Sequence, residues 1–128
     1  MPQKTDSLIQ SSSEAIEHYL TTPNLLRALI LQLIKDFQTA QIPLTLNPDE
    51  NYSFEGLCDF IESVIDGHIK RVGTLKNLLN RVDLTEKQIK KAIPNALYSN
   101  LRLLTELIIK RELQKVVIRH WYQQSSNK

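Results

Sequence analysis

Apolar residues recur at the spacing of an α-helix along almost the whole chain. In residues 23–40, a main apolar stripe is broadened by a second set of apolar residues on its flanks. The main stripe is Leu26, Leu29, Ile30, Leu33 and Phe37, and the second set is Leu25, Ala28, Leu31 and Ile34. A helix that is apolar over most of its circumference usually lies near the centre of a bundle. No segment of useful length alternates with a period of two, so the sequence predicts no sheet.

The composition favours the same fold class. Only 3 glycines occur in the 128 residues, and the chain is rich in helix-forming residues such as Leu, Ile, Lys, Glu and Gln. A chain of this length can bury a real core within one domain. We therefore predict an all-α protein, a single-domain helical bundle of four to six helices without a sheet. The domain is expected to span residues 1–128, with frayed tails at 1–5 and 124–128.

Capping and breaking residues indicate where the first helices begin. A helix is expected over about 6–20, with a later start if Ser11 and Glu14 form a capping box. Pro23 suits the first position of the next helix, because its missing N–H would have no partner there. Two prolines in the following loop argue against a helix between residues 41 and 51.

Two more helices are expected in the second half. Thr85 as the N-cap and Gln88 at the third helical position form the pattern of a capping box. A short helix should therefore run over about 86–93 and stop near Pro94. The last helix should begin near 96 or 99 and continue to about 123, and it carries two apolar lines rather than one.

A heptad pattern crosses the middle of the chain. Starting at Ile61, seven positions step by 4 and 3 residues alternately, which is the spacing of a coiled-coil contact line. We favour one helix from 53 to 83, possibly kinked, which would carry the whole line. The alternative is that Gly67 or Gly73 ends one helix and Thr74 caps the next. We predict that six residues of this line form an interaction seam: Ile61, Ile65, His68, Val72, Leu75 and Leu79.

Charge is divided unevenly between the halves of the chain. Residues 1–66 hold 3 basic and 10 acidic residues, a net charge of −7, and residues 67–128 hold 13 basic and 4 acidic residues, a net charge of +9. Two stripes stand out. The acidic ridge is Glu55, Asp59, Glu62 and Asp66, and the basic ridge is Lys87, Lys90, Lys91, Arg111, Lys115 and Arg119. Such asymmetry is expected either for an anionic partner or for oppositely charged faces that pair within a bundle or between copies.

Known catalytic and metal-binding patterns fit poorly. Helical phosphotransfer domains typically carry His-x-x-Lys-Gly, but Arg71 stands three residues after His68 and the glycine comes too late. Di-iron bundles need Glu-x-x-His pairs, and no histidine of this chain has an acidic residue three positions before it. Cys58 is the only cysteine and lies on an apolar helix face, where an inert thiol is usual. We predict no catalytic residue, no metal ligand and no cofactor.

The sequence leaves two functions open. We favour a non-enzymatic helical protein–protein interaction module, such as an adaptor, chaperone or assembly factor. It would act through the interaction seam and the charged ridges on another protein or on a second copy of itself. The alternative is a nucleic-acid-binding regulator that uses the basic C-terminal half. Leu101, Leu103 and Leu104 argue against it, because they occupy the start of the helix that would have to read bases.

The expected location is the cytoplasm. The first residues are polar and lack the apolar stretch of a secretory signal, and a single cysteine is typical of reducing compartments. The most apolar run is too short to span a bilayer and is interrupted by Arg27 and Gln32. We therefore expect no membrane association.

Overall fold

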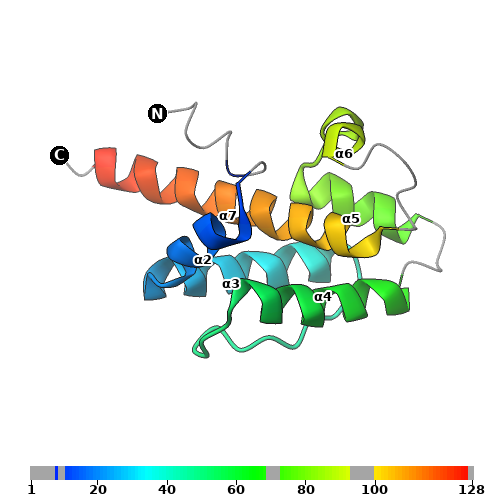
Figure 1. Cartoon of the computed structure of the whole chain (residues 1–128), viewed down its shortest axis with the longest axis horizontal. Coiled ribbons are helices and arrows are strands. Elements are labelled where there is room, and N and C mark those ends of the chain that lie inside the picture. The colour runs from blue at the N-terminus through cyan, green and yellow to red at the C-terminus, as the bar shows by residue number, and fades with distance from the viewer. Residues whose placement is uncertain (1–7, 9–10, 69–72, 93–99, 127–128) are drawn as a thin grey trace.

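The computed structural model describes residues 8, 11–68, 73–92 and 100–126. These residues contain six helices and no strand, which confirms the predicted all-α bundle of four to six helices. In Figure 1 the helices lie in an elongated bundle, with α7 running along its length. The helices are α2 (Ser13–Leu20), α3 (Pro23–Thr39), α4 (Phe54–His68), α5 (Thr74–Val82), α6 (Glu86–Ala92) and α7 (Leu101–Ser126).

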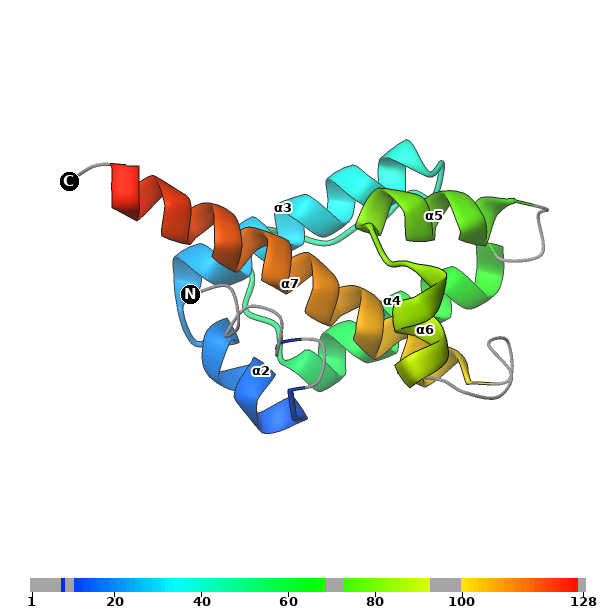
Figure 2. The ribbon, with the colours of Figure 1, turned by 90° about the horizontal axis from the view of Figure 1, so that it is seen from above.

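Helix α7 is the central element of the bundle. It packs against α3, α4, α5 and α6, while α2 covers α3 and α4 (Figures 1 and 2). Contact with neighbours on several sides explains why α7 carries two apolar lines. Residues of both lines are buried within the chain: Leu104, Ile108, Ile109, Leu113, Val116 and Val117. The second line therefore needs no partner molecule to cover it.

Helix α3 buries the stripe that the sequence indicated. Its five main-stripe residues are at most 4% exposed, whereas Leu31 of the flanking set is 46% exposed. The segment after α3 was expected to be a simple loop, but it contributes to the core as well. Ile42, Leu44 and Leu46 are buried while the residues between them are exposed, so this extended segment lays every second side chain on the bundle.

Local capping signals set several helix ends as predicted. The backbone N–H of Gln88 donates to Thr85 Oγ1 at 3.1 Å, and Thr85 N–H donates to Gln88 Oε1 at 3.0 Å, which is a complete capping box. Pro23 is the first residue of α3. The first helix does start late, but its cap is Ser12, whose hydroxyl accepts from Ala15 N–H at 3.2 Å.

The sequence analysis predicted frayed tails at both ends of the chain. The last helix was expected to end at about 123, but α7 continues to Ser126. The frayed tail at 124–128 stays a prediction. No glycine or proline occurs there to stop the helix. Residues 1–5, the other expected tail, lie outside the described residues.

The continuous helix predicted over 53–83 is wrong. Helix α4 ends at His68 and α5 begins at Thr74. Gly73, which precedes α5, has φ of +86°, a left-handed conformation that costs a residue with a Cβ about 1–2 kcal/mol. The heptad spacing therefore crosses a break between two helices that pack on each other. Its regular steps do not form one line on one helix.

No helix among the described residues is sufficiently long and apolar to cross a membrane.

Two glycines that the sequence analysis treated alike should respond in opposite ways to alanine. Gly67 lies inside α4, and a Cβ there would meet no atom within 4 Å, so Gly67→Ala should stabilise the fold by about 0.5 kcal/mol. Gly73→Ala should destabilise it by about 1 kcal/mol, because alanine is strained at its positive φ. Urea unfolding of both variants tests this. Equal effects of the two substitutions would contradict the assigned break.

Candidate interaction surface

The acidic ridge of α4 faces the first turn of α7, where Arg102 lies among its carboxylates. Arg102 Nη1 is 2.7 Å from Asp59 Oδ1 and 3.3 Å from Glu62 Oε1, and Nη2 is 2.5 Å from Glu55 Oε2. The Oε2 atom of Glu106, one turn further along α7, lies 3.4 Å from Arg102 Nε. The hydrogen bond to Asp59 is the largest of the effects that raise the pKa of Arg102 above its ordinary value. The guanidinium is therefore a permanent charge that joins α4 to α7.

This cluster carries more negative than positive charge. Three carboxylates of the acidic ridge and Glu106 lie against one guanidinium, and with Asp66 at the end of the ridge the excess is about four negative charges at neutral pH. Asp66 is exposed and, among the described residues, is in no ion pair. Among the described residues, the acidic ridge is thus neutralised only in part.

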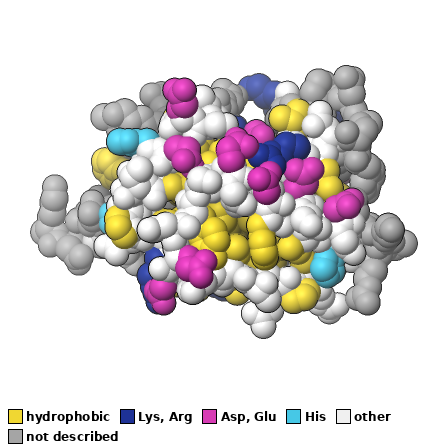
Figure 3. All heavy atoms as spheres, turned by 60° about the horizontal axis from the view of Figure 1, so that its bottom comes forward, with side chains coloured by type: hydrophobic (Ala, Val, Ile, Leu, Met, Phe, Trp, Pro, Cys, Tyr) yellow, Lys and Arg dark blue, Asp and Glu magenta, His cyan; other side chains and the backbone are white. Residues whose placement is uncertain are grey.

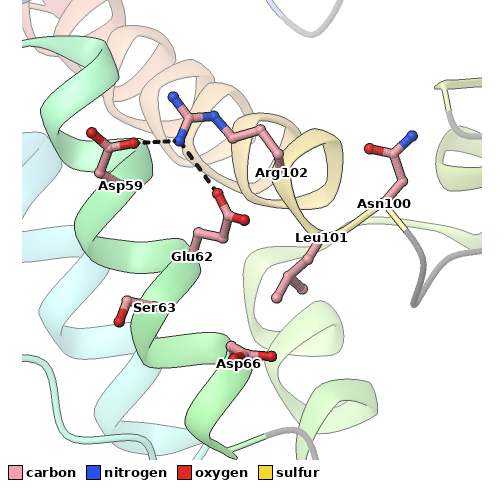
Figure 4. Close-up of a pocket in the computed structure, with 7 residues that line it drawn as sticks. All are labelled: Asp59, Glu62, Ser63, Asp66, Asn100, Leu101 and Arg102. Carbon is pink, nitrogen blue, oxygen red and sulfur yellow. Dashed lines mark hydrogen bonds and ion pairs between the residues drawn. The ribbon is translucent and has the colours of Figure 1, made fainter.

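A cleft of about 560 Å³ opens beside the acidic ridge, between α4 and the start of α7. Figure 4 shows Arg102 reaching across it towards Asp59 and Glu62, with Asp66 at the far end near the last turn of α4. The lining is mainly polar. It consists of Asp59, Glu62, Ser63, Asp66, Asn100, Leu101 and Arg102.

The outer surface of α4 is unusually flat. Gly56, Ser63 and Gly67 are all exposed, and they lie between the acidic ridge and Phe60, which is 36% exposed. Figure 3 shows apolar side chains over the middle of this face of the molecule, with the acidic cluster beside them. Small residues allow another backbone to approach a helix closely. We call this surface, from the acidic ridge across to Phe60, the α4 face.

The predicted interaction seam lies mostly inside the molecule. Ile61 and Ile65 are fully buried and Leu75 is 5% exposed, all in the core cluster. His68 and Leu79 are half-buried, and the His68 ring is bonded through Nδ1 to Val64 O at 2.8 Å. Val72 lies outside the described residues. The apolar spacing of the buried members is accounted for by packing within one chain, and they offer no surface to a partner.

The predicted basic ridge is divided into two parts with different surroundings. On α7, Arg111 Nη2 lies 2.9 Å from Asp83 Oδ2, and Arg119 Nη2 donates to Gln32 Oε1 at 2.5 Å. Lys115 is bound to carboxylates of the bundle. On α6, by contrast, the lysines are exposed and form no ion pair with a described residue. They are Lys87, Lys90 and Lys91.

Lys115 belongs to a buried charged cluster that the sequence analysis did not anticipate. Its Nζ lies 2.8 Å from Asp36 Oδ2 on α3 and 2.7 Å from Glu112 Oε1 on α7, and it donates to Arg81 O of α5 at 3.1 Å. Asp36 is 2% exposed and Glu112 is fully buried. Gln32 also donates to Asp36 Oδ2, at 2.9 Å. Three helices therefore meet at one polar point inside the core.

The two buried carboxyl groups of this cluster have pKa values shifted in opposite directions. Burial raises the pKa of Glu112 to about 9, and the neighbouring Asp36 adds to this rise, whereas Lys115 lowers it. Burial also acts to raise the pKa of Asp36, but its contacts with Glu112, Lys115 and Gln32 leave it below the ordinary value. At neutral pH the cluster thus holds a neutral Glu112 beside an ionised Asp36.

This arrangement predicts an unusual dependence of stability on pH. A carboxyl group with a raised pKa contributes its full stabilisation below its ordinary pKa, and the contribution is lost as the pH rises to the folded pKa. For Glu112 this window runs from 4.5 to about 9. Glu112→Gln keeps the neutral shape, so it should be more stable than the wild type by about 1 kcal/mol or more near pH 8, with little difference near pH 4. Urea unfolding across the pH range measures the difference.

The variant Asp36→Asn serves as the comparison for Glu112→Gln. It removes the ionised partner and leaves Lys115 without its main counter-charge, so it should destabilise the protein at neutral pH. A stability difference between Glu112→Gln and the wild type that stays constant from pH 4 to 9 would show that Glu112 is already ionised in the fold.

Cys58 is fully buried, and burial raises the pKa of its thiol to about 12, which opposes the formation of a thiolate. Within the described ranges, no group of three His, Cys, Asp or Glu side chains is placed to hold a metal ion.

The sequence analysis did not identify Arg102, Asp36 or Glu112 as functional or structural sites. The sequence did contain a signal for Asp36 and Glu112. Asp36 stands between Ile34 and Phe37 in the most apolar helix, and Glu112 follows Ile108 by four residues in the last one. A charged residue on an apolar helix face predicts a buried partner. Arg102 gave no such signal, because which basic residue meets the acidic ridge depends on how α7 crosses α4.

Comparison with protein-family models, with curated proteins and with solved structures finds no match for this chain.

Proposed function

We propose that this protein is a non-enzymatic protein–protein interaction module, an adaptor, chaperone or assembly factor, and that the α4 face is its docking surface. The observation that carries the proposal is the excess of carboxylates over guanidinium beside an exposed aromatic side chain and a flat helix surface. The partner that suits this surface is a basic amphipathic helix. Its apolar side would contact Phe60, and its lysines or arginines would enter the cleft.

The two parts of the α4 face have different roles in this proposal. An aromatic side chain supplies large apolar contact area and is a common source of binding energy, so Phe60 is the anchor. Exposed charge pairs add less affinity, but they speed encounter and select basic over acidic partners. The flat strip of Gly56, Ser63 and Gly67 supports the proposal because it lets a partner helix lie close along α4.

This proposal keeps the kind of function that the sequence favoured but assigns it to a different surface of the protein. The docking surface is the side of α4 opposite to the interaction seam, because Ile61 and Ile65 of the seam are buried in the core. The absence of a cofactor and a cytoplasmic location remain part of the proposal. A lone buried cysteine supports the location, since a reducing compartment leaves such a thiol unpaired.

Nucleic-acid binding is the second candidate, and the exposed lysines of α6 favour it. The rest of the basic ridge gives it little support, because Arg111 and Lys115 are half-buried and bonded to carboxylates. Three lysines on a short helix are a small phosphate-binding surface, since specific complexes commonly make about 6–10 phosphate contacts.

A labelled amphipathic peptide of lysine and leucine is a direct probe of the α4 face. Its affinity, measured by fluorescence anisotropy, should fall about fivefold or more in the double variant Asp59→Asn/Asp66→Asn, and again in Phe60→Ala. The charge effect should shrink at high salt, because exposed ion pairs are screened.

The matched control for the charge variant is Glu14→Gln/Glu86→Gln. It removes the same net charge from exposed sites on α2 and α6, away from the α4 face. If the control weakens peptide binding as much as the α4 variant does, the attraction is a property of net charge and the docking surface is refuted. A peptide in which glutamate replaces lysine should not bind at all.

A further inference from the structure

The lysines of α6 and the acidic ridge of α4 are opposite in charge. Lys90 and Lys91 follow Lys87 by 3 and 4 residues, and Glu62 and Asp66 follow Asp59 by 3 and 7 residues. Each set therefore lies along one side of its helix. All three lysines are exposed, and none pairs with a carboxylate among the described residues. Two complementary helix faces thus remain without a full set of partners.

These two faces cannot meet within one chain. Helix α7 packs against both α4 and α6, and in Figure 1 the two helices lie on opposite sides of it, with α6 at the top and α4 at the bottom. The view from above in Figure 2 agrees, because α6 there lies over the region of α4 and α7. Only another molecule can bring an α6 to an α4 face.

We propose that the occupant of the α4 face is a second copy of this chain, which docks through its α6. This inference rests on the proposed function of the α4 face and names its partner. Lys90 and Lys91 of one copy would extend into the cleft of the next, where Asp59 and Asp66 lie, and their aliphatic stems would cover Phe60. Phe60 is exposed at the edge of the same surface.

The symmetry of this contact follows from its two different halves. A surface on α4 meets a surface on α6, so the contact is heterologous, and a pair of copies keeps one free α4 face and one free α6. Copies therefore join head to tail into short chains rather than closing as a twofold dimer. Because the contact is made largely of exposed ion pairs, it should be weak and strongly dependent on salt.

Sedimentation velocity of the full-length protein tests the inference. At about 20 mM salt, the weight-average sedimentation coefficient should rise with protein concentration, and at about 500 mM salt it should stay at the monomer value. Lys90→Glu/Lys91→Glu should abolish the rise, and so should Asp59→Lys/Asp66→Lys. Asp66→Lys alone is a milder version that leaves the bond between Asp59 and Arg102 in place.

Two comparisons separate specific docking from the effect of net charge. The control Lys35→Glu/Lys76→Glu changes the net charge by as much as Lys90→Glu/Lys91→Glu does, but at exposed sites on α3 and α5. It should associate like the wild type. Mixing the two inactive double variants should restore association, since each supplies the charge that the other has lost. Failure of the mixture to associate would overturn the pairing of α4 with α6.

The remaining outcomes distinguish this inference from the proposed function. A wild type that stays monomeric at low salt overturns self-docking, whereas binding of the lysine–leucine peptide tests the α4 face independently. If Lys90→Glu/Lys91→Glu leaves association unchanged but abolishes binding to labelled duplex DNA, self-docking is wrong and the α6 lysines form a phosphate-binding surface.

Discussion

The structure depends on the burial of α7 among four other helices. Because this helix is covered on several sides, charged residues in its middle cannot all reach water, and each needs a partner on a neighbouring helix. Lys115 meets Asp36 of α3 beside Glu112, and Arg111 meets Asp83 after α5. At the other end, Arg102 joins α7 to α4. The same ion pairs that permit burial also fix the order in which helices surround α7.

This constraint determines which charges remain available at the surface. The basic second half of the chain appears in the sequence as one charged region, but three of its basic residues, Arg102, Arg111 and Lys115, pair with carboxylates of the described residues. The acidic excess on α4 and the exposed lysines of α6 lie on opposite sides of α7. Among the described residues, the predicted pairing of an acidic and a basic face is therefore only partly met, and under the proposed function a partner would recognise the groups left unpaired.

The buried cluster around Lys115 costs folding free energy that an apolar core would not cost. A carboxyl group with a pKa near 9 is kept protonated by its surroundings, and replacing such groups with neutral ones is often stabilising. Through Lys115, this cluster joins Asp36 of α3 and the backbone of α5 to α7.

The sequence by itself determined the all-α fold class and several helix ends. Helical periodicity, the capping box at Thr85 and Pro23 at a helix start are local signals, because the atoms that satisfy them are a few residues away. The tertiary structure decided which faces are buried and which charges are paired. The heptad that was predicted to mark an interface crosses the break between α4 and α5, and the acidic ridge meets Arg102, which is not part of the predicted basic ridge. Helical spacing places residues on a common face, but only the packing of one helix against another decides what that face contacts.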